Sequence, residues 1–231
     1  MFFDFKFWHF LTNTHQLANQ LQTSTMRGFK KRILFVFFFG ILLFSIREIW
    51  GMNTESITAL LSSMTTADYA IARFTSLVGA LIWSLVYMSF HFFGIAYLLS
   101  LLTAIPFKKV LPLQLLMTGI LLLEKAIIFF VFVMKGETAN VSFLSFGPLA
   151  ITYLDNWYLV LFLNQLTLTT VLIILLQYRF IRSSTDSVER KDILWLLLGI
   201  HIAMALITAA IGFIPIERLF DFIVGGGVGI E

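Results

Sequence analysis

Apolar residues in this chain fall in long continuous runs that are separated by short polar segments. Five runs stand out, at about 33–50, 74–105, 110–134, 157–178 and 193–214. Each reaches or approaches the ~20 residues that a helix needs to cross a bilayer, and none alternates as a barrel strand does. Backbone groups in lipid must be hydrogen-bonded within the structure, so such runs indicate helices. The pattern predicts an all-α integral membrane protein with a bundle of five transmembrane helices.

The composition supports a membrane protein. Hydrophobic residues make up 59% of the chain and charged residues 13%, and the mean hydropathy is +0.91. Soluble domains are about half apolar and about a quarter charged, and a soluble domain of this size could not bury so much apolar surface. The chain has no Cys, which excludes disulfides, thiol catalysis and zinc–thiolate sites. We expect no cofactor and no metal.

The basic residues predict the orientation of the spans. Of 16 Lys and Arg residues, five precede the first run, two lie between the second and third runs, and four lie between the fourth and fifth. Loops rich in Lys and Arg stay in the cytoplasm, so we expect a cytoplasmic N-terminus and a C-terminus outside. The expected cytoplasmic anchors are Arg27, Lys30, Lys31, Arg32, Lys108 and Lys109.

Three parts follow from this arrangement: a cytoplasmic amphipathic and basic arm (1–32), a five-helix transmembrane domain (33–215) and an extracytoplasmic tail (216–231). Apolar residues of the arm could share one face of a short helix lying on the bilayer. A docking element for a partner and a disordered arm are the alternatives. The basic cluster at 27–32 is interpreted as a membrane anchor, and no nucleic-acid partner is expected. Gly147-Pro148 predicts a turn or re-entrant segment in the outer loop 135–156.

Several polar residues interrupt the apolar runs. With a rise of ~1.5 Å per residue, they fall at a similar depth in the outer half of the membrane, and we predict one polar layer across four helices: Arg47, Glu48, His91, Glu124, Lys125, Asn164 and Gln165. Glu124 and Lys125 are neighbours and cannot face each other on a helix. We hypothesise crossed ion pairs, Arg47 with Glu124 and Glu48 with Lys125, which would leave the layer neutral.

Three roles remain open for this layer. It could fix helix register, hold a partner helix, or carry protons or ions, since ionisable residues inside a membrane suggest function by default. Enzyme motifs are missing from the sequence: there is neither an HExxH pair nor a GxSxG elbow. We therefore expect a protein that is not an enzyme, with an intramembrane hydrolase as a remote alternative.

Three stretches carry a resemblance to a known family. They read IPFKKVLPLQLLMTGILLLEKAI from residue 105, DNWYLVLFLNQLTLTTVLIILLQYRF from residue 155 and RKDILWLLLGIHIAMALITAAI from residue 190. In hydropathy and loop chemistry these resemble bacterial members of the YIP family of multi-pass membrane proteins, above all the YknW type. The resemblance covers roughly residues 30–215 and supplies no catalytic residues.

The resemblance implies a multi-pass protein of the bacterial cell membrane that serves an ABC exporter as an accessory component in toxin resistance. We therefore expect a non-enzymatic accessory or scaffold protein, with membrane lipid and an ABC exporter subunit as partners. The alternative is a small transporter or channel that uses the polar layer.

Overall fold

The computed structural model describes residues 2–52, 65–136, 141–185 and 190–213. The chain divides into two compact units, the first formed by Met1–Asn140 with Val171–Leu197 and the second by Val141–Thr170 with Leu198–Glu231. The tail expected at 216–231 lies outside the described residues.

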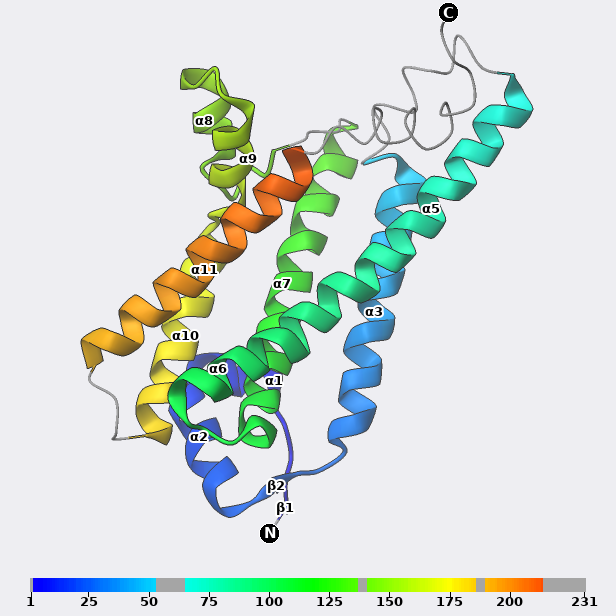
Figure 1. Cartoon of the computed structure of the whole chain (residues 1–231). Helices are drawn as coiled ribbons and strands as arrows, with labels where there is room; N and C mark the ends of the chain where they lie inside the picture. The colour runs from blue at the N-terminus through cyan, green and yellow to red at the C-terminus, as the bar shows by residue number, and fades with distance from the viewer. Residues whose placement is uncertain (1, 53–64, 137–140, 186–189, 214–231) are drawn as a thin grey trace, which may run out of the picture. The chain divides into compact units, whose positions relative to one another are not determined.

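Helices dominate the structure (Figure 1). They are α1 (Phe7–Thr12), α2 (Thr14–Thr23), α3 (Phe29–Trp50), α5 (Thr66–Ser89), the π-helix η2 (Phe90–Gly94), α6 (Ile95–Thr103), α7 (Phe107–Lys135), α8 (Gly147–Tyr153), α9 (Trp157–Gln165), α10 (Leu168–Ser184) and α11 (Arg190–Phe213). Two short strands, β1 (Phe2–Phe3) and β2 (Thr25–Met26), pair in parallel. The all-α fold is confirmed.

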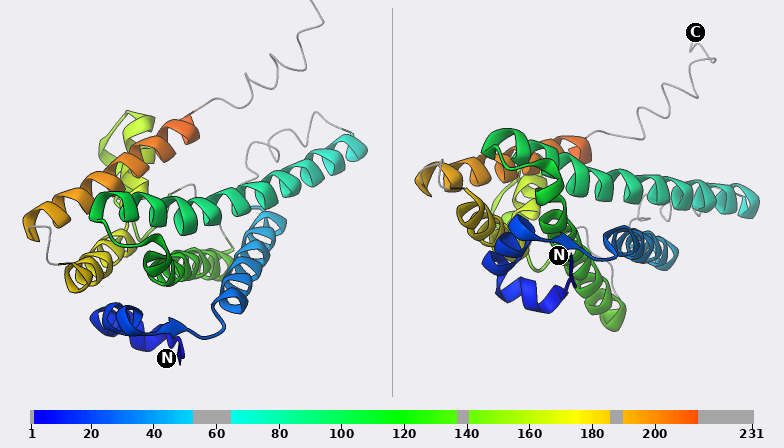
Figure 2. Two further views of the ribbon diagram at one scale, coloured as in Figure 1. Left: turned by 60° about the horizontal axis from the view of Figure 1, so that its bottom comes forward. Right: turned by 90° about the horizontal axis from the view of Figure 1, so that it is seen from below.

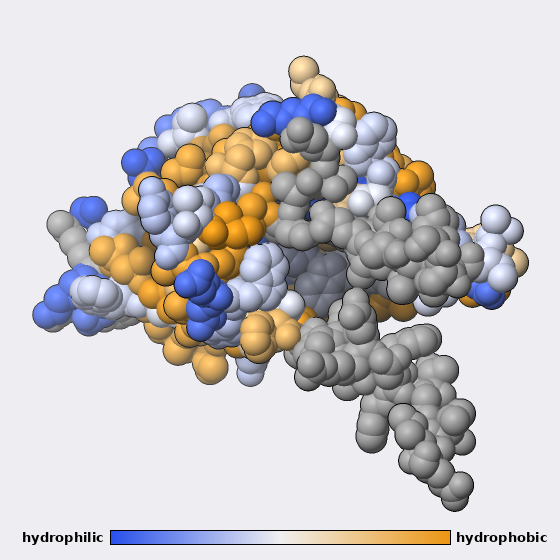
Figure 3. Space-filling view, turned by 90° about the horizontal axis from the view of Figure 1, so that it is seen from above, coloured by the Kyte–Doolittle hydropathy of each residue, from blue (hydrophilic) through white to orange (hydrophobic). Residues whose placement is uncertain are grey.

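Four of the described helical stretches are long and apolar enough to cross a membrane. They are α3, the continuous stretch from α5 through η2 to α6, α7, and α11 without its first residue. Large apolar side chains such as Leu34, Phe74 and Trp195 lie exposed on these helices, and the space-filling view shows apolar residues at the surface (Figure 3). Lipid is the solvent that such surfaces require, so the structure is of the membrane-protein type.

The core of the first unit lies around α7. Of the most apolar window of α7, 56% is buried inside the chain, against 22% for α3 and 28% for the stretch through α5 and α6. The three helices meet at Gly40 of α3, where a Cβ would overlap the Met88 thioether of α5 and come 3.2 Å from Leu122 of α7. Glycine lets the helix backbones approach closely here, as small residues do between membrane helices.

The N-terminal arm is part of this core. Phe10 and Leu17 are buried. The pairing of β1 with β2 joins the two ends of the arm. The ring of Phe7 lies against Gly119 of α7, where a Cβ would come 2.7 Å from the ring. Figures 1 and 2 show the arm at the end of the unit where α3 and α7 begin. The amphipathic residues of the arm thus pack on the chain's own helices.

The fourth apolar run forms two helices, which differs from the single span expected at 157–178. α9 ends at Gln165 and α10 begins at Leu168. Thr167 acts as N-cap of α10, because its hydroxyl accepts a hydrogen bond from Thr170 N (3.2 Å) while Thr170 Oγ1 accepts one from Thr167 N (3.3 Å). These paired bonds form a variant of the capping box. Hydroxyl side chains thus satisfy backbone groups at the point where the helix is broken.

Candidate functional site

Tyr87 of α5 interacts with three residues of the predicted polar layer: His91, Arg47 and Glu124. The Tyr87 ring lies 4.4 Å from the His91 ring and 5.8 Å from the Phe44 ring, centroid to centroid. Its hydroxyl is within electrostatic range of Glu124 on α7 and of Arg47 on α3. Tyr87 of α5 therefore interacts with both α3 and α7.

Arg47 lies along the aromatic side of this cluster. Its guanidinium carbon is 5.6 Å from the centre of the Phe44 ring, a distance at which a cation interacts favourably with an aromatic face. Arg47 also interacts electrostatically with Tyr87 and with its neighbour Glu48. Its Nε is buried and has no hydrogen-bond partner in the described part of the chain. The ring of Phe44 thus supplies part of the stabilisation that an ion pair would give.

Glu48 faces α5. Its carboxylate accepts a hydrogen bond from Ser76 Oγ, and Arg73 donates to the backbone oxygens of Glu48 (3.0 Å) and Ile49 (3.2 Å). Arg73 therefore caps the C-terminal end of α3, where free carbonyls and the helix dipole favour a cation. These contacts tie the start of α5 to the end of α3.

Glu124 is a buried carboxylate on α7. Its side chain is only 4% exposed, and Oε1 has no hydrogen-bond partner among the described residues. Lys125 beside it is half-buried and interacts electrostatically with Glu124 and Arg47. The crossed ion pairs hypothesised from the sequence are not formed within the described residues, because Glu48 is turned toward Ser76 and the Arg47 side chain toward Phe44.

His91 lies in the π-helix that interrupts the second apolar run. Its ring stacks obliquely on Tyr87 and meets Phe90 edge-on at 5.9 Å. A π-bulge shifts the register of the helix after it and often marks a functional position. Tyr87 thus has His91 as a ring neighbour and Glu124 as an electrostatic neighbour.

Asn164 and Gln165 belong to the second unit, where they end α9. Asn164 Oδ1 accepts hydrogen bonds from Ser142 N and Ser145 Oγ, both at 2.8 Å, and Gln165 donates weakly to Leu161 O (3.5 Å). A β-bridge between Ser145 and Thr167 lies beside them. Asn164 thus holds the segment before α8 against the break in the fourth run.

Gly147-Pro148, expected in a turn or re-entrant segment, begins the short helix α8, which packs against α9. A Cβ on Gly147 would come 2.7 Å from Asn164 Oδ1. The missing side chain of Gly147 therefore lets the start of α8 lie directly against Asn164 near the end of α9.

The basic anchors lie where α3 and α7 begin. Arg27 precedes α3 directly, Lys30, Lys31 and Arg32 occupy its first turns, and Lys108 and Lys109 occupy the first turn of α7. In Figure 1 these two helix starts lie at the same end of the first unit. Arg32 reaches the arm, with its guanidinium carbon 5.7 Å from the centre of the Phe5 ring.

Sequence reasoning missed Tyr87, Ser76 and Thr167. Tyr87 and Ser76 lie in the second apolar helix, and nothing in the sequence distinguishes them from other residues of a transmembrane helix. Only the packing of the helices shows what they contact. Thr167 and Thr170 carried a signal, because a Thr-x-x-Thr pair can cap a helix in the way of a capping box. Among the described residues, no group of three His, Asp or Glu is arranged to hold a metal.

Comparisons with known proteins returned no match: no family model, no curated protein and no solved structure is significantly similar to this chain.

Proposed function

We propose that this chain is a non-enzymatic accessory protein that assembles in the membrane with another integral membrane protein. The observation that carries the proposal is the open lateral surface of the helices. Only 22% of the most apolar window of α3 and 28% of that of α11 is buried inside the chain. Helices of this kind can be covered by lipid or by the helices of a partner. Co-purification from native membranes distinguishes these two possibilities.

We also propose that the protein lies in the bacterial plasma membrane, with its N-terminus in the cytoplasm. It crosses the membrane five times and has an ABC exporter as its partner. What supports the orientation is the shared location of the basic starts of α3 and α7. Five crossings require α9 and α10 together to form the fourth. The exporter and toxin resistance rest on the family resemblance alone.

The surface of α5 has a site where a helix of a partner could pack closely. Gly79 is exposed, and a Cβ added there would meet nothing within 4 Å. Thr75 lies one turn earlier and is also exposed. Small residues of this kind let a second helix approach in lipid. Gly79 is therefore a probe of assembly whose substitution costs the fold little.

The test is co-purification of the tagged full-length chain from native membranes in mild detergent. We expect an ABC exporter subunit in stoichiometric amount, and we expect Gly79→Ile to weaken its capture. Leu85→Phe is the matched control, because it adds bulk to an exposed position on another face of α5. Recovery of the chain without any stoichiometric membrane protein would contradict the proposal.

A small transporter or channel is the second candidate. Two features favour it: the buried carboxylate of Glu124, whose Oε1 has no hydrogen-bond partner in the part of the chain that the structure describes, and the interrupted helices at η2 and between α9 and α10. Transporters build their sites from discontinuous helices, and their proton relays use buried carboxylates. Flux in liposomes that contain only this protein, lost in Glu124→Gln but kept in Ser76→Ala, would establish this function in place of the first.

A further inference from the structure

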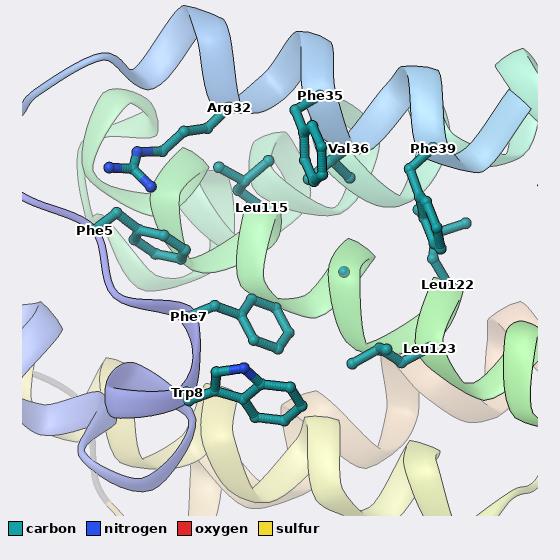
Figure 4. A pocket seen from close by; sticks show the side chains of 11 residues that line it. Phe5, Phe7, Trp8, Arg32, Phe35, Val36, Phe39, Leu115, Leu122 and Leu123 are labelled. Carbon is teal, nitrogen blue, oxygen red and sulfur yellow. The ribbon is translucent and has the colours of Figure 1, made fainter. Parts of the chain in front are cut away.

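An apolar pocket lies between the N-terminal arm, α3 and α7, all within the first unit. Its volume is about 360 Å³, within the range of roughly 300–1,000 Å³ that is usual for small-molecule sites. Phe5, Phe7 and Trp8 form the wall that belongs to the arm (Figure 4). The pocket exists only because the arm packs against α7.

The walls offer almost no polar group. Phe35 and Phe39 extend into the pocket from α3, and Leu115 and Leu123 extend from α7 (Figure 4). Trp8 and Phe35 are 70% and 68% exposed, so the pocket opens to the outside of the unit. A polar ligand would lose its hydrogen bonds to water here without replacement, which makes its binding costly. The lining therefore selects a hydrocarbon chain.

One end of the pocket is charged. Arg32 is the cation of the lining, and its guanidinium carbon lies 5.7 Å from the Phe5 ring centre. No described carboxylate forms an ion pair with Arg32. Arg27, Lys30 and Lys31 precede it within a few residues and are exposed. Arg binds phosphate oxygens through two parallel N–H bonds, which suits an anionic head group.

The charged and apolar ends are ordered along the helices. On α3 the pocket extends from Arg32 to Phe39, which at ~1.5 Å per residue is about 10 Å along the helix axis. That is about two thirds of one leaflet, since the hydrocarbon core is ~30 Å thick. Arg32 lies in the first turn of α3, near the other basic residues, and the pocket extends from there toward the middle of α3 and α7.

We propose that this pocket binds an acyl chain of an anionic phospholipid from the leaflet that faces the basic end of the chain, with Arg32 paired to the lipid phosphate. Basic sites next to transmembrane helices bind anionic lipid head groups in this way. The bound chain fills the space between the arm and the two helices, so the lipid holds the arm in place. The site is independent of the partner and of the polar residues around Tyr87.

The test is native mass spectrometry of the full-length protein, exchanged into detergent with equal amounts of phosphatidylglycerol and phosphatidylcholine. We expect the wild type to retain one phosphatidylglycerol molecule. Val36→Trp places an indole in the pocket and should abolish retention. Leu34→Trp is the matched control, because Leu34 lies on the same helix, is 73% exposed and does not line the pocket.

A second pair of variants tests the head group. Arg32→Gln should lower the preference for phosphatidylglycerol over phosphatidylcholine by about tenfold, because the phosphate of phosphatidylcholine is offset by its own choline cation and gains less from a charge-assisted bond to Arg32. Lys31→Gln removes the same charge outside the pocket and should leave the preference intact. Equal retention of both lipids by the wild type, or equal effects of the two Gln variants, would overturn the proposal. If Val36→Trp does not fold, the Arg32 and Lys31 comparison still decides it.

Discussion

The third and fourth apolar runs differ in an unexpected way. The third contains Pro112, Glu124 and Lys125, yet α7 is one unbroken helix of 29 residues. The fourth contains no charge between Trp157 and Gln177, yet it breaks between Gln165 and Leu168.

The difference teaches what interrupts a helix in apolar surroundings. A buried charge such as Glu124 raises the energy of the helix without offering its backbone another partner. Thr167 and Thr170 offer such partners, because their side chains bond to backbone N–H and carbonyl groups at the break. The backbone of the break also pairs with residues before α8, since Leu168 N donates to Leu144 O (3.1 Å) and Phe146 N donates to Leu166 O (3.3 Å). In α7, Pro112 lies near the start of the helix, and Thr118 bonds back to Gln114 O within the helix. Alternative hydrogen-bond partners for the backbone, and not charge, thus distinguish the two runs.

The largest effect is expected from reversing the charge in the unbroken run. Glu124→Lys places a further cation beside Arg47 and Lys125 in a buried position, and we expect a loss of about 3 kcal/mol or more in the free energy of unfolding. Glu124→Gln should leave stability unchanged or slightly higher, because it removes a poorly solvated charge. Unfolding in detergent followed by circular dichroism measures both. Equal stability of the Lys variant would show that Glu124 has access to water.

A smaller effect is expected at the broken run. Asn164→Leu removes the acceptor of Ser142 N and Ser145 Oγ, and we expect a loss of about 1–3 kcal/mol. Amide hydrogen exchange over residues 142–146 should become faster. Asn164→Asp keeps the acceptor oxygen and should preserve the protection. Unchanged exchange in the Leu variant would mean that the bridge between Ser145 and Thr167 holds the segment without Asn164.

The smallest effect is expected from the cap itself. Thr167→Ala removes the hydroxyl that accepts from Thr170 N, and loss of an N-cap costs about 1 kcal/mol. Exchange of the Thr170 amide should become faster. Thr169→Ala serves as the control, because the Thr169 hydroxyl takes no part in this cap. Slower exchange around Leu166 and Thr167 would instead indicate that α9 and α10 had fused into one helix.

The sequence predicted much of the fold but less of the site. The bounds expected for the first, third and fifth runs agree with α3, α7 and α11 to within a few residues, because continuous apolar runs dictate helices in lipid. A common level of Arg47, His91 and Glu124 stays a prediction that rests on helix rise alone. The partners were not predicted: Ser76 bonds Glu48, and Tyr87 lies where the crossed ion pairs were hypothesised to form.

The amino-acid sequence by itself determined the helical, membrane-protein class and the ends at which basic residues gather, because both follow from the composition of individual segments. Only the tertiary structure decided that the arm packs on α7 at Gly119, that Glu124 is buried with an oxygen that has no partner among the described residues, and that an apolar pocket ends at Arg32. The physical reason is that hydropathy specifies which surfaces avoid water, whereas pairing and cavities depend on which helix faces meet.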